Sequence, residues 1–191
     1  MYRIFEFLYR KTRNATAYML YLCIYNFLKI RQLPMVMAQR QPVFVSDETC
    51  CPNNGDVYAI VVKYAGFGLE TGFLEMLDAM RQTGINAIVV CNGAPDESML
   101  ASLRKSAHRI LVRENIGRDM GAYRAATLYL YETGLNPHKI IYCNDSVFFL
   151  EGKPLLDMFS TLANSTSDVH GTFENHQFNY HFGSYVFSIS G

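Results

Sequence analysis

Two short runs of the sequence combine nitrogen- and oxygen-bearing side chains in patterns that suit phosphate chemistry. The first covers residues 113–124, where Asn115 and Gly117 close an apolar run. Arg118 and Asp119 follow at the predicted start of a helix. Free backbone N–H groups at a helix start bind phosphate when a guanidinium stands beside them. Two other interpretations stay open, because Asp119 could cap the helix or form a surface ion pair with Arg118.

The second run, residues 140–149, is an apolar strand pattern that brings Asn144, Asp145 and Ser146 together. Three oxygen-bearing side chains at the end of a buried strand suit Mg²⁺ or Mn²⁺, hard cations that keep some waters and bridge phosphates. A polar turn between two apolar segments is the alternative. Only Asp145 can be ionised, so a cation bound there would need further negative oxygens from the phosphates.

Short β-branched runs alternate with helical patterns, and this alternation predicts the elements that position both polar runs. Strands are predicted at 57–64, 85–93, 109–115, 139–149, 168–174 and 184–190, and helices at 72–84, 96–107, 120–134 and 154–163. Alternation at this spacing is typical of right-handed βαβ units. The sequence therefore predicts an α/β fold with a single, mainly parallel sheet and helices on both faces.

Polar and glycine residues stand at the carboxyl ends of the predicted strands. Lys63 and Tyr64 end the first strand, and Asn92 ends the second. Ligands of such sheets bind beyond the carboxyl ends of the strands. We therefore expect these three side chains to share one ligand site with the two polar runs.

The charges are unevenly spread, although the net charge of the 191 residues is zero. Residues 1–40 carry seven Lys or Arg and one Glu, a charge of +6, whereas the rest carries ten Lys or Arg and sixteen Asp or Glu, a charge of −6. An acidic main body argues against a nucleic-acid-binding protein. Cys91 and Cys143 fall inside apolar strand patterns, so we expect buried thiols and no disulfide framework.

The basic segment 1–40 holds an uncharged, aromatic-rich stretch between its Arg and Lys clusters. At about 15 residues this stretch is shorter than the roughly 20 that a membrane-spanning helix needs. We expect either an interfacial helix on an anionic membrane surface or a helix packed on protein, a second copy of the chain included. Residues 41–56 have the turn signals of a linker, and the α/β domain is predicted at 57–191.

The order of these pieces resembles a known family. Strand 57–64, helix 72–84 and strand 85–93, followed by IGRDMGAYRAA and IIYCNDSVFF, look like the nucleotide-binding half of GT-A glycosyltransferases. The N-x-G-R-D-x-G-A run, the N-D-S strand end and the closing YHFGSYVF (180–187) are similar to the rhamnan synthesis protein F family. The resemblance covers roughly residues 57–190. That family is longer, so we expect a fragment or a reduced homologue.

The resemblance implies transfer of a sugar, such as rhamnose, from a nucleotide donor to a glycan or lipid-linked glycan of a bacterial cell surface. It places Lys63, Tyr64 and Asn92 toward the nucleoside, and Arg118 and Asp119 near the diphosphate or the sugar. The segment 144–146 stands where GT-A enzymes carry their Asp-x-Asp metal motif, with Asn in the first position, and a late histidine could reach metal or phosphate. That histidine is His181, and the candidates for the acceptor base are Asp168, Glu174 and His176.

Two further alternatives follow from the same sequence. A non-catalytic binding module in a polysaccharide-assembly complex would keep the sheet and the donor pocket. A Rossmann oxidoreductase fits poorly, because no G-x-G-x-x-G follows the first strand. We expect a cytoplasmic protein, peripheral at the inner face of the plasma membrane if segment 1–40 binds lipid.

Overall fold

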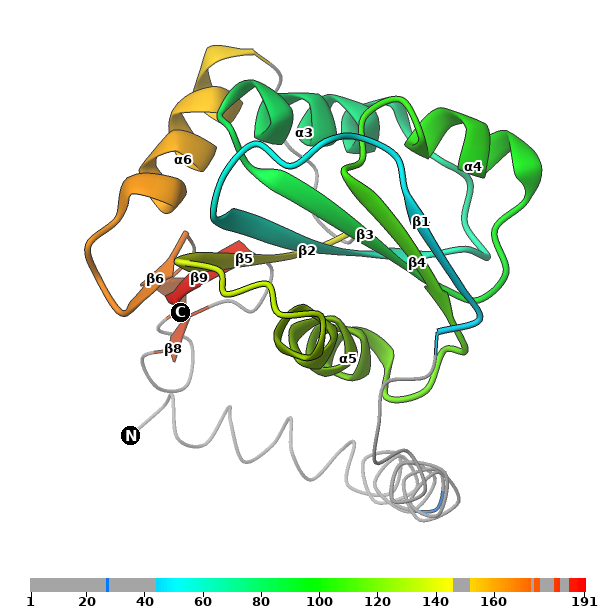
Figure 1. Cartoon of the computed structure of the whole chain (residues 1–191). Coiled ribbons are helices and arrows are strands. Elements are labelled where there is room, and N and C mark those ends of the chain that lie inside the picture. Colours follow the sequence, from blue (N-terminus) through cyan, green and yellow to red (C-terminus); the bar gives the residue numbers. More distant parts are fainter. Residues whose placement is uncertain (1–26, 28–43, 146–151, 173, 176–180, 183–185) are drawn as a thin grey trace, which may run out of the picture. The chain divides into compact units, whose positions relative to one another are not determined.

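The structure is a computed structural model of the chain (Figure 1). It describes residues 27, 44–145, 152–172, 174–175, 181–182 and 186–191. The chain divides into two compact units, Met1–Arg40 and Gln41–Gly191. The predicted interfacial helix in segment 1–40, apart from residue 27, lies outside the described residues, so that expectation stays a prediction.

A seven-stranded sheet forms the centre of the second unit, with the strand order β1-β4-β3-β2-β5-β9-β6. The four middle strands are parallel to one another, and β1, β9 and β6 each pair antiparallel to a neighbour. The strands are β1 (Ser46–Thr49), β2 (Val57–Tyr64), β3 (Asn86–Asn92), β4 (Arg109–Arg113), β5 (Lys139–Asn144), β6 (Val169–Gly171) and β9 (Val186–Ser190). A separate pair joins β7 (Glu174–Asn175) to β8 (His181–Phe182).

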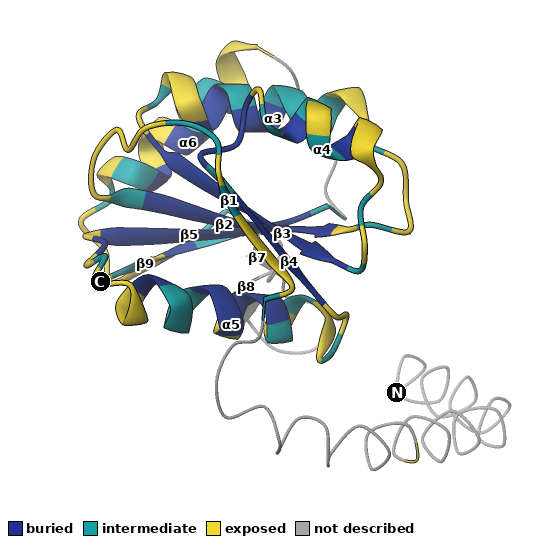
Figure 2. Cartoon of the chain, turned by 45° about the vertical axis from the view of Figure 1, so that its right-hand side comes forward, coloured by how far each residue is buried: buried dark blue, intermediate teal, exposed yellow. Residues whose placement is uncertain are grey.

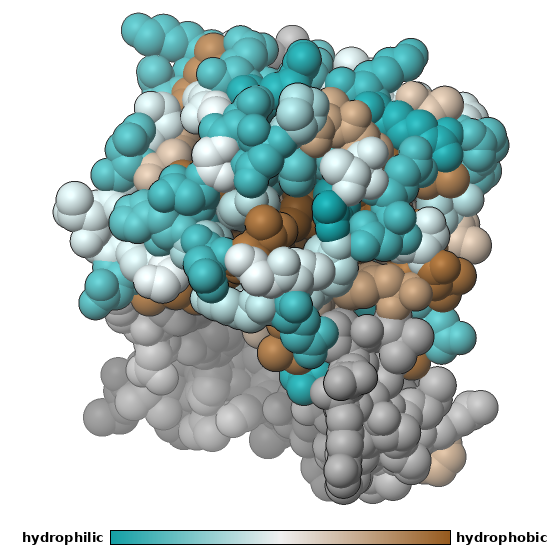
Figure 3. Space-filling view, viewed as in Figure 1, coloured by the Kyte–Doolittle hydropathy of each residue, from teal (hydrophilic) through white to brown (hydrophobic). Residues whose placement is uncertain are grey.

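Helices cover both faces of this sheet (Figures 1 and 2). Three of them, α3 (Thr71–Gln82), α4 (Glu97–Leu103) and α6 (Lys153–Asn164), pack on one face, and α5 (Arg118–Glu132) packs on the other. Their buried sides turn toward the strands, and mostly hydrophilic side chains cover the outer side of α3 and α6 (Figures 2 and 3).

The alternation of side chains along each strand explains the two apolar cores. In β2, Ala59 and Val61 face α3 and α6, whereas Ile60 and Val62 face α5, and all four are buried. Because successive side chains of a strand point to opposite faces, a strand covered on both sides must be apolar throughout. The sequence VYAIVVKY meets this requirement up to Lys63.

The predicted fold class is confirmed, and most elements fall within a few residues of their predicted positions. Asp96 caps the start of α4, where Met99 N donates to Asp96 Oδ1 at 2.7 Å. One difference lies in the predicted linker 41–56, where Ser46–Thr49 forms the edge strand β1. Its sequence, SDET, has the charges of an edge strand and no apolar pattern, which is why it was missed.

The two cysteines predicted to be buried, Cys91 and Cys143, have no exposed surface in β3 and β5. Burial raises the pKa of the Cys91 thiol to about 12.

Within the described part of the chain, no helix is long and apolar enough to span a membrane.

A strap of residues 50–54 crosses the amino ends of β3 and β4. Asn86 donates through Nδ2 to Asn53 Oδ1 at 2.8 Å and accepts from Asn54 N at 2.9 Å. His108 O accepts hydrogen bonds from the backbone N–H groups of Cys50 and Cys51. These contacts fix the chain immediately before β2.

His108 gives the strap a predicted pH dependence. Burial lowers the pKa of its imidazole below the ordinary 6.5. The folded state therefore favours the neutral ring, and the stability held above pH 6.5 is lost as the pH falls through the folded pKa. We expect urea unfolding to show a declining free energy from pH 7.5 to 5.5. His108→Gln should flatten this decline, and an unchanged slope would contradict the assignment.

Candidate active site

The crevice between β2 and β5 is the point where the order of the parallel strands reverses. From β2, the chain passes to β3 and β4 on one side and to β5 on the other. Of the helices next to this crevice, α3 and α6, which follow β2 and β5, lie on one face, and α5, which leads into β5, lies on the other. Ligands of open α/β sheets bind at such switch points.

Lys63 and Asp145 form an ion pair in this crevice. Lys63 Nζ lies 3.0 Å from Asp145 Oδ2, and Lys63 is only 3% exposed. The same oxygen accepts a hydrogen bond from Tyr64 N at 3.0 Å. Both donors therefore contact Oδ2, and the pair joins the ends of the two strands that border the crevice.

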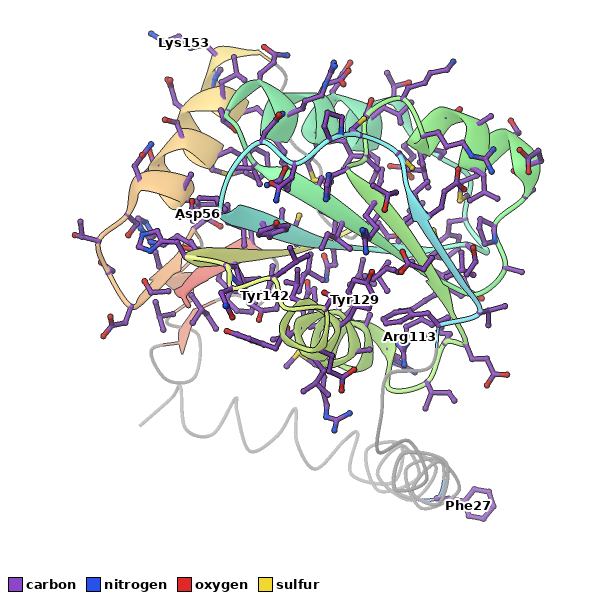
Figure 4. The ribbon with its side chains drawn as sticks, viewed as in Figure 1. Phe27, Asp56, Arg113, Tyr129, Tyr142 and Lys153 are labelled. Atoms are coloured by element: carbon purple, nitrogen blue, oxygen red, sulfur yellow. The ribbon has the colours of Figure 1, made fainter. Side chains whose placement is uncertain are left out.

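Asn92 and Arg113 lie at the same edge, on the α5 side of the sheet. Arg113 Nη1 donates to Asn92 Oδ1 at 3.0 Å, and Nη2 donates to Ile116 O at 2.8 Å. Burial lowers the pKa of the guanidinium, and among the described residues no carboxylate pairs with it. Arg113 thus fixes the turn between β4 and α5, beside which Figure 4 shows it.

Asn144 and Asp119 connect β5 to the first turn of α5. Asn144 Nδ2 donates to Asp119 Oδ2 at 2.9 Å, and Asn144 is 6% exposed. The N-cap of α5 is Gly117, and no side chain caps this helix. The open alternative that Asp119 caps α5 is therefore wrong, because its carboxylate is turned toward β5.

A left-handed turn brings the chain from β4 into α5. Gly117 has φ 75° and Arg118 has φ 52°, a region that non-glycine residues rarely enter. A Cβ atom placed on Gly121 would lie 2.2 Å from Ile116 O, so only glycine fits there. Gly117 thus supplies the left-handed conformation of this turn, and Gly121 leaves space for the Ile116 carbonyl.

The remaining predicted donor-binding residues of this edge are exposed. Arg118 and Asn115 lie on the surface of the turn, and Arg118 forms no ion pair with another described residue. The alternative of an Arg118–Asp119 surface ion pair is not what the structure shows. Tyr64 is 40% exposed and meets Phe67 edge to face, with ring centroids 5.1 Å apart.

The predicted base candidates are not all placed together. Asp168 precedes β6, its backbone carbonyl accepts from Ser190 N at 2.9 Å, and Ser190 pairs with Lys139 at the start of β5. Asp168 therefore lies near the amino end of β5, whereas Asp145 lies at its carboxyl end. Glu174 and His181 belong to the β7–β8 pair, and Ser146 and His176 lie outside the described residues.

Two residues of this edge escaped the sequence analysis. Arg113 is the last residue of β4, and the strand pattern in the sequence indicates no further role for it. Tyr123 is 4% exposed on α5, and its hydroxyl is buried without a hydrogen-bond partner among the described residues. Burial, with Asp119 and Asp145 among the nearby charges, raises the pKa of this hydroxyl. Helical spacing identifies Tyr123 as a core residue but does not show that its hydroxyl lacks a partner.

The described residues do not form a metal centre by themselves. No three His, Cys, Asp or Glu side chains among them lie close enough to hold a metal ion. Asp145 also has the Lys63 ammonium at 3.0 Å, which reduces its attraction for a cation. The predicted Mg²⁺ or Mn²⁺ site therefore does not fit the described residues alone.

Comparisons with known proteins give one relative and one solved structure. An uncharacterised protein of Sinorhizobium fredii, y4gN, is 31% identical over 133 residues, which cover 68% of this chain and 34% of that protein. The chain thus spans about a third of the length of that relative. No family model matches the sequence.

The solved structure is the apo form of the glycosyltransferase GlyE of Streptococcus pneumoniae. It matches with a TM-score of 0.34 and 11% identity, over 71% of this chain and 34% of that one. A match at this TM-score and identity supports no conclusion about function. The evidence for function therefore comes from the residues of the crevice.

Proposed function

We propose that this chain is the nucleotide-sugar-binding part of a glycosyltransferase with a GT-A-like fold. The observation that supports it is the Lys63–Asp145 pair at the switch point between β2 and β5, with two further polar pairs at the same edge. The donor would be a nucleotide sugar, with rhamnose as the sugar implied by the resemblance to the rhamnan synthesis protein F family. The acceptor would be a bacterial cell-surface glycan or lipid-linked glycan.

The proposed chemistry requires neutralisation of a departing diphosphate. Sugar transfer builds positive charge on the sugar and negative charge on the leaving group. Arg118, the free N–H groups at the start of α5 and the ammonium of Lys63 are positive groups at this edge, in addition to the buried guanidinium of Arg113. We propose that they take the diphosphate, with Tyr64 and Asn92 toward the nucleoside.

A cation could join these positive groups only if further ligands, such as the phosphate oxygens of the donor, supplemented the described side chains. Asp145 is the one described carboxylate of segment 144–146, and in the proposal its Oδ1 faces the donor. When bound, Mg²⁺ or Mn²⁺ would supply positive charge to the diphosphate. The expected dependence on metal is therefore modest, because Lys63 already supplies a charge beside Asp145.

Binding of nucleotide sugars tests the proposal directly. We expect Asp145→Ala and Arg118→Ala each to weaken the affinity about 10- to 1,000-fold, or roughly 1.4–4 kcal/mol. Isothermal calorimetry with UDP- and dTDP-sugars, with and without Mn²⁺, measures this.

The matched controls for these two variants are exposed residues away from the crevice. Arg124→Ala lies on the same helix as Arg118, and Asp157→Ala lies on α6. Both should bind like the wild-type chain. Wild-type affinity in Asp145→Ala and Arg118→Ala would reject the site, and no binding by the wild-type chain to any donor would reject the function.

A non-catalytic donor-binding module is the second candidate, and the ion pair of Asp145 with Lys63 favours it. A carboxylate that already accepts from Lys63 and from Tyr64 N is a weak metal ligand. Calorimetry and a donor-hydrolysis assay separate the two candidates, since a module of this kind would bind a nucleotide sugar and never release free sugar from it.

A further inference from the structure

A pocket of about 250 Å³ opens at the amino ends of β3 and β4, at the opposite edge of the sheet from the candidate active site. β3 runs from Asn86 beside the pocket to Asn92 in the site. At about 3.3 Å per residue, the two places are roughly 20 Å apart. The pocket therefore belongs to none of the three polar pairs of the proposed donor site.

The size and walls of the pocket suit a small ligand with an apolar side. Its volume of about 250 Å³ lies below the roughly 300–1,000 Å³ of pockets for drug-sized ligands. Cys51 and Pro52 supply apolar surface, whereas Ile85 and Ala87 line the pocket at only 2% exposure. The strap, the end of α3 and the segment before β4 supply polar groups. A single sugar ring combines hydroxyl groups with an apolar C–H face in this size range.

His108 supplies a buried acceptor in the wall of the pocket. The residue is 8% exposed, and its Nδ1 has no hydrogen-bond partner among the described residues. Burial lowers the pKa of the ring, which keeps it neutral, and backbone groups of Cys51 and Pro52 act in the opposite direction, as carbonyl acceptors do. We therefore place the ring proton on Nε2, which leaves Nδ1 with a lone pair for an O–H donor.

The charges around the pocket balance. Arg81, which is 53% exposed, pairs with Asp78 at 3.2 Å, and the same carboxylate oxygen accepts from Ser106 Oγ at 2.9 Å. An anion would meet this carboxylate and the negative end of α3, and a cation would meet the guanidinium. A neutral ligand that both donates and accepts hydrogen bonds avoids both penalties.

We propose that this pocket binds an uncharged, hydroxyl-rich molecule the size of one sugar ring. One hydroxyl donates to His108 Nδ1, and the Arg81 guanidinium donates to further hydroxyl oxygens. The ring lies with its C–H face against Cys51 and Pro52, the apolar lining residues that present surface. This inference does not rest on the proposed donor site, and it holds or fails independently of it.

Ligand-observed saturation-transfer NMR on the whole chain tests the pocket. The probes are methyl α-rhamnoside, methyl α-glucoside and myo-inositol, with inorganic phosphate and betaine as charged probes. We expect saturation transfer to at least one neutral probe and to neither charged probe. Arg81→Ala and His108→Phe should each raise the dissociation constant of the neutral probe at least tenfold.

Lys105→Ala is the matched control, because Lys105 is exposed and neighbours Ser106 without lining the pocket. It should bind the neutral probe like the wild-type chain. If His108→Phe fails to fold, His108→Asn and the exposed Arg81→Ala still decide the matter. Binding unchanged in Arg81→Ala, Arg81-dependent phosphate binding, or no saturation transfer to any neutral probe would each overturn the proposal.

Discussion

Gly121→Ala is expected to destabilise the domain by about 3 kcal/mol, because the new methyl group has no room. Its Cβ would lie 2.2 Å from the carbonyl oxygen of Ile116, a backbone atom that cannot rotate away. Arg113 holds the same carbonyl at 2.8 Å, so a shift of Ile116 also breaks that hydrogen bond. Urea unfolding followed by circular dichroism measures the loss.

Gly72→Ala provides the control on another helix. Gly72 lies in α3, and an added Cβ there meets nothing within 4 Å. Alanine should stabilise that helix by about 0.5 kcal/mol, because glycine loses more backbone entropy on folding. Similar effects of the two substitutions would show that residue 121 has more space than the structure indicates.

Asp145→Ala is expected to cost about 3 kcal/mol of folding stability, apart from any effect on a ligand. The substitution leaves the Lys63 ammonium 3% exposed and without its carboxylate. Tyr64 N also loses its acceptor. Thermal and urea unfolding in the absence of nucleotide measure this cost separately from binding.

The double variant Lys63→Met with Asp145→Ala separates charge from packing. Removal of both charges should restore more than half of the lost stability, since an uncompensated buried charge is the main cost. Nucleotide-sugar binding should stay weak in the double variant. A double variant as unstable as Asp145→Ala alone would show that the ion pair is not the source of the effect.

The sheet could be predicted from the sequence because its strands are buried on both faces. Runs such as VYAIVVKY and INAIVVCN have few other stable environments, and glycine or a charged first turn marks the ends of the helices. The edge strand β1 could not be predicted in this way. Its residues are stabilised by pairing with β4, a contact across more than fifty residues that no local pattern records.

The candidate site was predicted in outline, and its pairing was not. Strand ends brought Lys63, Asn92 and Asn144 to one edge, as the parallel alternation required. Which side chains contact each other depends on the face that each strand presents and on the turn at Gly117. For that reason the contacts of Asp145 with Lys63 and of Asn144 with Asp119 appear only in three dimensions.

The edge strand has a practical consequence for anyone who shortens the chain. A fragment that starts at residue 57, the boundary that the sequence suggests, would discard β1 and the Asn53 contact with Asn86. The outer edge of β4 would then present a row of free amide and carbonyl groups, which recruit strands from other molecules. Expression trials of this domain should therefore begin upstream of Ser46, or they will select for aggregation.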